Sequence, residues 1–217
     1  MKTDSRALIL DFDGLIVDTE TPGFLAWQEV YEAEGAHLEV ADWLNAVGYV
    51  NGFDPRAHLT TLTGRTFDWT ARDAFISQRA RELIAAQPVL PGVRELIKQG
   101  LRLGYRLGVA SNSTADWVLP NLERLGLREF FGAVCTVDMV ARPKPQPDVY
   151  LAALAALGVA TAVGSYAFED SLPGVQAARA AGLRVVAVPN ALTRHQDLSG
   201  ADEVKEAGLA GFTLEAI

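Results

Sequence analysis

Short apolar runs recur along the chain, and each ends in polar or turn-forming residues. Runs that are apolar at every position are typical of strands buried on both faces of a sheet. Between them, apolar residues recur every three or four positions, as in 93–101 and 149–157, which predicts helices. Strand and helix in alternation predict an α/β fold with a doubly wound parallel sheet. The expected strands are 7–11, 106–111, 133–136, 165–170 and 184–189.

The region from Val17 to Pro88 interrupts this alternation. It has no run of the buried-strand kind, and its patterns are helical, with Phe24, Trp27 and Tyr31 at helical spacing. We therefore expect a small helical domain, residues 17–88, inserted after the first strand. The sheet domain is then discontinuous and comprises residues 1–16 and 89–217. The four tryptophans of the chain are best explained as packing residues, with Trp27 in the core of the insert.

Composition narrows the class of protein. With 217 residues, 49% of them hydrophobic and 21% charged, the chain is long enough to bury a sizeable core. A formal charge of −8 without clustered lysine or arginine argues against a nucleic-acid partner. No apolar stretch has the length of a signal peptide or a membrane span. The single cysteine, Cys135, cannot form an internal disulfide, and its apolar neighbours indicate a buried thiol, so we expect a cytoplasmic protein.

Polar side chains follow the ends of the expected strands. Because ligands of open α/β sheets bind beyond the carboxyl ends of the strands, these side chains should converge. Crowded carboxylates repel one another unless a cation lies among them, and oxygen ligands in this number suit Mg²⁺. A lysine and a serine hydroxyl near a helix start favour an anion, so the pocket predicts a phosphate. The residues are Asp11 and Asp13 after the first strand, Ser111 and Asn112 after the second, Lys144 in the loop after the third, and Glu169 and Asp170 at the end of the fourth.

Four motifs carry a resemblance to a known family. "DFDGLIVDTE", "VASNS", "KPQPDVY" and "FEDS" stand in the order and approximate spacing of the motifs of the haloacid dehalogenase superfamily. They run through the whole expected sheet domain, and the helical insert stands where that superfamily places a cap. The chain most resembles the phosphatases and sugar-phosphate mutases with a small helical cap. The resemblance implies a Mg²⁺-dependent phosphatase acting on a small phosphorylated metabolite, such as a sugar phosphate or phosphoglycolate.

The resemblance also implies roles for individual residues. Asp11 would attack phosphorus and form an aspartyl-phosphate. Asp13 would protonate the leaving oxygen and then activate water. Ser111 and the Asn112 amide would hold the phosphoryl oxygens, and Lys144 would neutralise both these oxygens and the nucleophile.

For the metal, the resemblance implies that Asp11, Asp170 and the backbone carbonyl of Asp13 hold Mg²⁺, with Glu169 acting on the ion directly or through a water. Two aspartates at an extended strand end, two positions apart, can both reach one phosphate. Gly14 then lets the chain turn sharply away from the site.

Other functions fit the pattern less well. A mutase of the β-phosphoglucomutase kind is the alternative, but that group usually carries a histidine after the "DT" of the first motif, where this chain has Gly23. A true dehalogenase lacks the second aspartate. A receiver domain does not open with Asp-x-Asp on its first strand and needs no cap. The three histidines share no spacing that suggests a metal-ligand set or a catalytic triad.

The identity of the substrate cannot be read from the sequence. The insert loop "GYVNGFDPRAHL" is the expected specificity element, because Gly and Asn permit a tight turn and Arg56 has the length to contact an acidic group. Asn51 and Arg56 are therefore the candidate specificity residues, although a surface position explains Arg56 equally well. The oligomeric state stays open.

Overall fold

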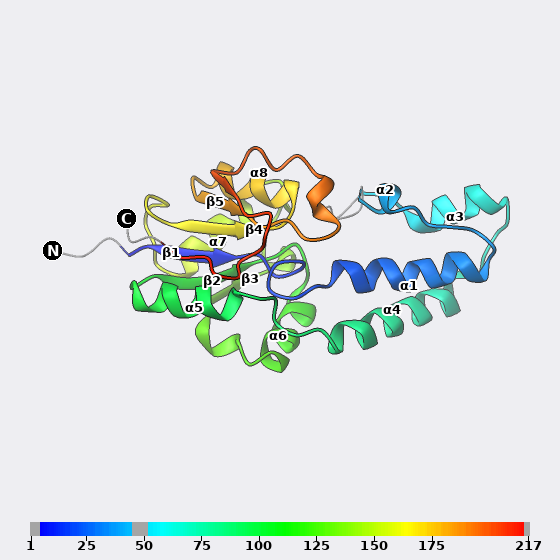
Figure 1. Ribbon diagram of the computed structural model, residues 1–217, viewed down its shortest axis with the longest axis horizontal. Helices are drawn as coiled ribbons and strands as arrows, with labels where there is room; N and C mark the ends of the chain where they lie inside the picture. The colour runs from blue at the N-terminus through cyan, green and yellow to red at the C-terminus, as the bar shows by residue number, and fades with distance from the viewer. Residues whose placement is uncertain (1–4, 45–51, 215–217) are drawn as a thin grey trace.

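The computed structural model describes residues 5–44 and 52–214, and its centre is an all-parallel sheet (Figure 1). The strand order is β3-β2-β1-β4-β5-β6, and every neighbouring pair is parallel. The expected doubly wound α/β fold is confirmed. The edge strand β6 was not expected, because two residues are too few to form a recognisable apolar run. The strands are β1 (Ala7–Leu10), β2 (Arg106–Ala110), β3 (Ala133–Cys135), β4 (Tyr166–Glu169), β5 (Arg184–Ala187) and β6 (Glu203–Val204).

Each face of the sheet has its own helices. Leu8 and Leu10 of β1 join an apolar cluster with residues of α5 and α6. Ala7 and Ile9, which point to the other face, join a second cluster with residues of α7 and α8. Burial on both sides explains why β1 is apolar at every position, and it holds the carboxyl end of the strand rigidly. The helices are α5 (Val93–Arg102), α6 (Ala115–Arg124), α7 (Asp148–Ala156) and α8 (Leu172–Ala180), with short 3₁₀ turns η1 (Arg128–Phe130), η2 (Val137–Met139) and η3 (Thr193–His195).

Between β1 and β2 the chain leaves the sheet and forms a helical body, which we call the insert. Figure 1 shows it beyond the carboxyl end of β1, with α1 and α4 side by side. The insert has its own apolar cluster, which includes Phe24, Tyr31 and Leu59 and against which Trp27 packs as predicted. Its helices are α1 (Glu20–Ala33), α2 (Val40–Trp43), α3 (Pro55–Thr63) and α4 (Trp69–Ala85).

The two chain segments that join the insert to the sheet lie next to each other. Val17 and Val89 form an antiparallel bridge, and the N–H of Leu90 donates to the carbonyl of Ile16 at 2.9 Å. A third connection comes from the loop after β5, where Leu192 is buried in the apolar cluster of the insert. The insert is thus attached close to the strand end that carries Asp11 and Asp13.

Two observations bear on expectations drawn from composition. Within the part of the chain that the structure describes, no helix combines the length and apolar character needed to cross a bilayer. Cys135, at the end of β3, is free and buried as predicted.

Candidate active site

The ends of the central strands bring the predicted polar residues together. Asp11 directly follows β1, and its backbone N–H donates to the carbonyl of Phe168 in β4 at 2.9 Å. Ser111 follows β2, and its N–H donates to the carbonyl of Cys135 in β3 at 3.0 Å. Because β1 lies between β2 and β4, Asp11 is flanked on one side by Ser111 and on the other by Glu169.

Lys144 reaches into this row from the loop after η2 and is only 3% exposed. Its Nζ donates to Asp11 Oδ1 at 2.5 Å, to Glu169 Oε1 at 2.6 Å and to the carbonyl of Ala110 at 2.8 Å. The Asn112 side chain fixes the backbone at this position, since its Oδ1 accepts from the Lys144 N–H at 2.8 Å and its Nδ2 donates to the Lys144 carbonyl at 3.3 Å. Asn112, which follows β2, therefore holds the Lys144 backbone in the position from which Nζ contacts Asp11, the candidate nucleophile.

Three buried carboxylates form a candidate metal site. Oxygen atoms of Asp11, Glu169 and Asp170 all lie within 4.8 Å of one another, and the three residues are 6%, 0% and 2% exposed. One ammonium cannot neutralise three buried carboxylates, so the donor set fits a divalent cation. The side chain of Asp13 is not a member of this group.

The pKa values of Asp11, Asp170 and Lys144 are shifted because these groups are buried and lie close together. Burial raises the pKa of Asp11 to about 8, against the lowering effect of Lys144 and with the Glu169 and Asp13 charges adding to the rise. Burial, followed by the charges of Asp11 and Glu169, also raises the pKa of Asp170. Burial would lower the pKa of Lys144, but the Asp11 and Glu169 carboxylates outweigh it, so that pKa is raised and the lysine stays charged.

Glu20, in the first turn of α1, places a further carboxyl group near the acidic residues from the side of the insert. Burial, followed by the charges of Asp13, Asp11 and Asp18, raises the pKa of Glu20 to about 8. The Glu20 carboxyl therefore favours its protonated form at neutral pH.

Two glycines let backbone approach the acidic residues closely. A Cβ at Gly14 would lie 2.3 Å from Asp170 Oδ2, and Gly14 has a φ of +78°, which agrees with the sharp turn expected there. A Cβ at Gly174, in α8, would lie 1.9 Å from Glu169 Oε2. Any larger residue at either position would displace a carboxylate of the candidate site.

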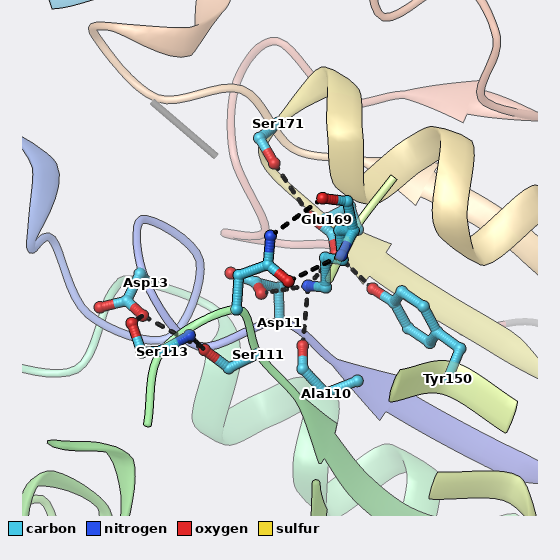
Figure 2. Close-up of polar contacts among 10 residues, drawn as sticks. Asp11, Asp13, Ala110, Ser111, Ser113, Tyr150, Glu169 and Ser171 are labelled. Atoms are coloured by element: carbon cyan, nitrogen blue, oxygen red, sulfur yellow. Dashed lines mark hydrogen bonds and ion pairs between the residues drawn. The ribbon is translucent and has the colours of Figure 1, made fainter. Parts of the chain in front are cut away.

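Asp13 lies apart from the carboxylate group and points toward the start of α6. Ser113 Oγ donates to its Oδ2 at 2.7 Å, Ser111 Oγ to the same atom at 3.3 Å, and Trp117 Nε1 to its Oδ1 at 2.9 Å. In Figure 2 the Asp13 carboxylate lies beside Ser113, away from Asp11, Glu169 and Tyr150. The ring of Trp117 packs against the core as expected, and its N–H has a second role, which packing did not predict, as a donor to Asp13.

Other residues that hold the acidic group were also missed by the sequence analysis. The hydroxyl of Tyr150 in α7 donates to Glu169 Oε1 (Figure 2). Asn190, in the loop after β5, donates through Nδ2 to Asp170 Oδ2 at 2.8 Å, and its Oδ1 accepts from two backbone N–H groups of the same loop. Tyr150 lies in the "KPQPDVY" motif, which was a usable signal, whereas no motif distinguishes Asn190.

The two candidate specificity residues do not join this site. Arg56 is exposed and forms an ion pair with Asp73 of α4, with Nη2 3.0 Å from Oδ1. Asn51 lies outside the described residues. His58 contacts the Tyr31 hydroxyl inside the insert, with 3.1 Å between Nδ1 and the hydroxyl oxygen.

Comparisons with known proteins extend the description of this site. A family model described as haloacid dehalogenase-like hydrolase matches residues 8–188. The chain is 37% identical over 188 residues to "Putative phosphatase YhcW" of Bacillus subtilis (strain 168), covering 87% of this chain and 85% of that protein. It is 33% identical over 183 residues to "Fructose-1-phosphate phosphatase YqaB" of Escherichia coli (strain K12), covering 83% and 95%. A crystal structure from Thermotoga maritima, titled as a "putative beta-phosphoglucomutase", matches with a TM-score of 0.75 and 26% identity over 92% of this chain and 94% of that one.

The fold and these relatives define a hydrolase of phosphate esters, which confirms the expected enzyme class. The chain belongs to the haloacid dehalogenase-like hydrolases, as the four motifs indicated.

Proposed function

We propose that the chain is a Mg²⁺-dependent phosphatase that hydrolyses a small phosphorylated metabolite through an aspartyl-phosphate on Asp11. The observation that carries the proposal is the contact between Lys144 and Asp11, 2.5 Å between Nζ and Oδ1, at the carboxyl end of β1. A cation held on the oxygen of a buried carboxylate suits the point where a nucleophile meets the negatively charged phosphoryl group.

In the first half-reaction, a carboxylate oxygen of Asp11 forms a bond to phosphorus while the bond between phosphorus and the ester oxygen breaks. Asp13 gives a proton to the departing oxygen, which leaves as an alcohol. Lys144, the Ser111 hydroxyl and the backbone N–H of Asn112 balance the negative charge on the remaining phosphoryl oxygens.

In the second half-reaction, a water oxygen bonds to phosphorus and the bond between phosphorus and Asp11 breaks. Asp13 accepts the proton of that water, which restores the protonation state with which it began. Inorganic phosphate leaves, and Asp11 is again a free carboxylate. Each turnover therefore consumes one ester and one water and yields one alcohol and one phosphate.

We assign the cation site to Asp11, Asp170 and the backbone carbonyl of Asp13. Glu169 Oε1 already accepts from Lys144 and Tyr150, so we assign Glu169 to contact with the cation through a water. An oxygen-only set with few carboxylates suits Mg²⁺, which retains several waters. When bound, Mg²⁺ would offset the negative charge that the phosphate brings to these carboxylates.

We also propose that residues 17–88 form a cap domain over a core of residues 1–16 and 89–217. The position of the insert beyond the carboxyl end of β1 and the paired segments at Ile16–Val17 and Val89–Leu90 support this division (Figure 1). Because Arg56 is paired within the insert, the specificity proposal now depends on Asn51 and on the carboxyl groups of Asp13 and Glu20.

The substrate class we propose is a sugar phosphate, by analogy with the fructose-1-phosphate phosphatase among the relatives. The carboxyl groups of Glu20 and Asp13 support it, because they form hydrogen bonds with hydroxyls and offer no positive charge to a second anionic group. A cytoplasmic location belongs to the same proposal. The mutase alternative is less favoured, since the two sequence relatives described above, each at least 33% identical, are named as phosphatases and Gly23 replaces the histidine expected of that group.

The test is turnover of p-nitrophenyl phosphate and a panel of sugar phosphates by the wild-type protein and by Asp11→Asn. The variant should keep its melting temperature within about 3 °C of wild type, a shift of roughly 1 kcal/mol, and lose turnover. Asp197→Asn, at an exposed turn, is the matched control and should retain activity. Turnover near the wild-type rate in Asp11→Asn would refute the nucleophile assignment, and an isomeric sugar phosphate without free phosphate would favour the mutase.

A further inference from the structure

We propose that Trp117 is a positioning residue: its indole N–H, together with the Ser113 hydroxyl, holds the Asp13 carboxylate in the orientation used for proton transfer to the leaving oxygen. This inference rests on the proposed function, which makes Asp13 the acid and base. No motif of the first strand or of the segment after β2 includes Trp117.

The two donors form hydrogen bonds to different oxygen atoms of the Asp13 carboxylate. Trp117 Nε1 lies 2.9 Å from Oδ1, and Ser113 Oγ lies 2.7 Å from Oδ2. Two donors on two different atoms fix the torsion of a carboxylate, which a single donor leaves free to turn. Trp117 and Ser113 lie 104 and 100 positions after Asp13 in the sequence, so these two hydrogen bonds exist only in the folded protein.

The indole donor is itself held in place. Trp117 lies in the first turn of α6 and packs against the apolar cluster on that face of the sheet, next to the fully buried Val118. The backbone N–H of Ser113 donates to Ser111 Oγ at 2.9 Å, which ties the loop before α6 to the end of β2. The direction of the Trp117 N–H is therefore set by core packing rather than by the site.

The two hydrogen bonds from Trp117 and Ser113 leave other lone pairs of the Asp13 carboxylate free to take part in proton transfer. A carboxylate oxygen can accept about two hydrogen bonds. Oδ1 receives one bond, from Trp117, and Oδ2 receives Ser113 together with a longer contact from Ser111 at 3.3 Å. When Ser111 turns its hydroxyl to a phosphoryl oxygen, the longer contact is given up. One position on each oxygen is then available to carry the proton that is given to the leaving oxygen, or to accept the proton of the attacking water.

Asp13 needs such support because other acidic side chains lie near it. Burial raises the pKa of Asp11 and of Glu20, and the charge of Asp13 adds to both rises. Without the two donors, the longer contact from Ser111 at 3.3 Å is what holds the orientation of the carboxylate. A catalytic group displaced by about 1 Å can lose up to roughly a hundredfold in rate.

The test uses leaving-group dependence, which packing alone does not change. Wild-type and Trp117→Phe proteins are assayed with aryl phosphates ranging from p-nitrophenyl phosphate to phenyl phosphate, and kcat/KM is plotted against the pKa of the leaving phenol. Phenylalanine keeps the aromatic packing and deletes the N–H. The variant should lose about tenfold in kcat/KM with phenyl phosphate but less than about twofold with p-nitrophenyl phosphate, because only the poorer leaving group needs a well-placed acid.

Two further variants complete the design. Trp69→Phe in the insert deletes an indole N–H far from Asp13 in sequence and should leave the slope unchanged. Ser113→Ala removes the second donor and should steepen the slope in the same direction, so it tests the proposal even when Trp117→Phe folds poorly. A parallel loss with every substrate, or an unchanged slope in a folded Trp117→Phe or Ser113→Ala protein, would overturn the proposal. Absence of turnover by wild type with every aryl phosphate and sugar phosphate would instead overturn the proposed function.

Discussion

Lys144 offers the sharpest test of the charge arrangement in the candidate site. Replacement by methionine keeps an unbranched side chain of similar length and removes the charge. It abolishes contacts with Asp11, Glu169 and the Ala110 carbonyl, and it leaves two adjacent carboxylates buried without their cation. In metal-free protein nothing else described at this position neutralises them.

The expected cost follows from burial. Lys144 and Glu169 are 3% and 0% exposed, so solvent screens their interaction little, and removing one partner of a buried ion pair costs about 3–5 kcal/mol. For a chain of this size each 1 kcal/mol shifts the melting temperature by about 2–4 °C. We therefore expect Lys144→Met to melt about 6–20 °C below wild type in EDTA at pH 8.

The cost should depend on pH with a definite sign. Burial raises the pKa of Asp11 to about 8, and loss of Lys144, which lowers that pKa, raises it further. A carboxyl group with a raised pKa in the folded state stabilises the fold below its unfolded pKa, and that stability is lost as the pH rises through the folded pKa. The difference in melting temperature between Lys144→Met and wild type should thus be smaller at pH 5 than at pH 8.

Thermal melting by circular dichroism with EDTA measures both effects. Arg179→Met is the matched control, because Arg179 pairs with Asp202 at 3.2 Å with both side chains substantially exposed, and such a pair contributes less than about 1 kcal/mol. If Lys144→Met melted no lower than the Arg179 control, or if its destabilisation grew toward low pH, the account of a charged lysine holding two buried carboxylates would be wrong.

Three other outcomes follow from the same site. EDTA should abolish hydrolysis, and added Mg²⁺ should restore it. Mg²⁺ without substrate should also raise the melting temperature, because the ion binds only the folded state. Full activity after demetallation would contradict the cation site. Asp13→Asn mixed with p-nitrophenyl phosphate should accumulate a phosphoryl group on the peptide that holds Asp11, detected by rapid-quench mass spectrometry, and a phosphoryl group on another residue would refute the assigned roles. Burial raises the pKa of Glu20 to about 8, so metal-free wild type should lose stability as the pH rises from about 4.5 to 8, by at most about 1.4 kcal/mol per pH unit from this group. Glu20→Gln should show a shallower decline of stability with pH. Identical pH slopes in the two proteins would show that Glu20 does not bind the extra proton.

The strand ends were predictable because each is a local feature. A fully apolar run predicts a strand buried on both sides, and the polar residues that follow it must lie at the carboxyl edge of the sheet. Asp11, Ser111 and Glu169 were placed in this way, and the structure brings them to neighbouring strands. Lys144 was assigned from its motif and the resemblance, and the structure places its Nζ between two of the carboxylates.

The residues that hold the predicted ones in place were not predictable, because their partners are distant in the sequence. Trp117 serves Asp13 from 104 positions away, and Asn190 serves Asp170 from a different loop. An indole at helical spacing has the same local pattern whether its N–H faces solvent or a carboxylate. The sequence pattern therefore favours packing for every tryptophan, and for Trp117 that interpretation is incomplete, because its N–H also donates to Asp13.

The sequence by itself determined the α/β fold, the break in alternation after the first strand and the set of charged groups at the strand ends, since burial and strand direction impose these on neighbouring residues. Tertiary structure alone decided which donors face which carboxylate oxygen. It also decided that Gly174 must lack a side chain so that Glu169 fits, and that Arg56 is paired inside the insert. These are contacts between separate elements, and they depend on how helices pack on the sheet, which a one-dimensional pattern does not record.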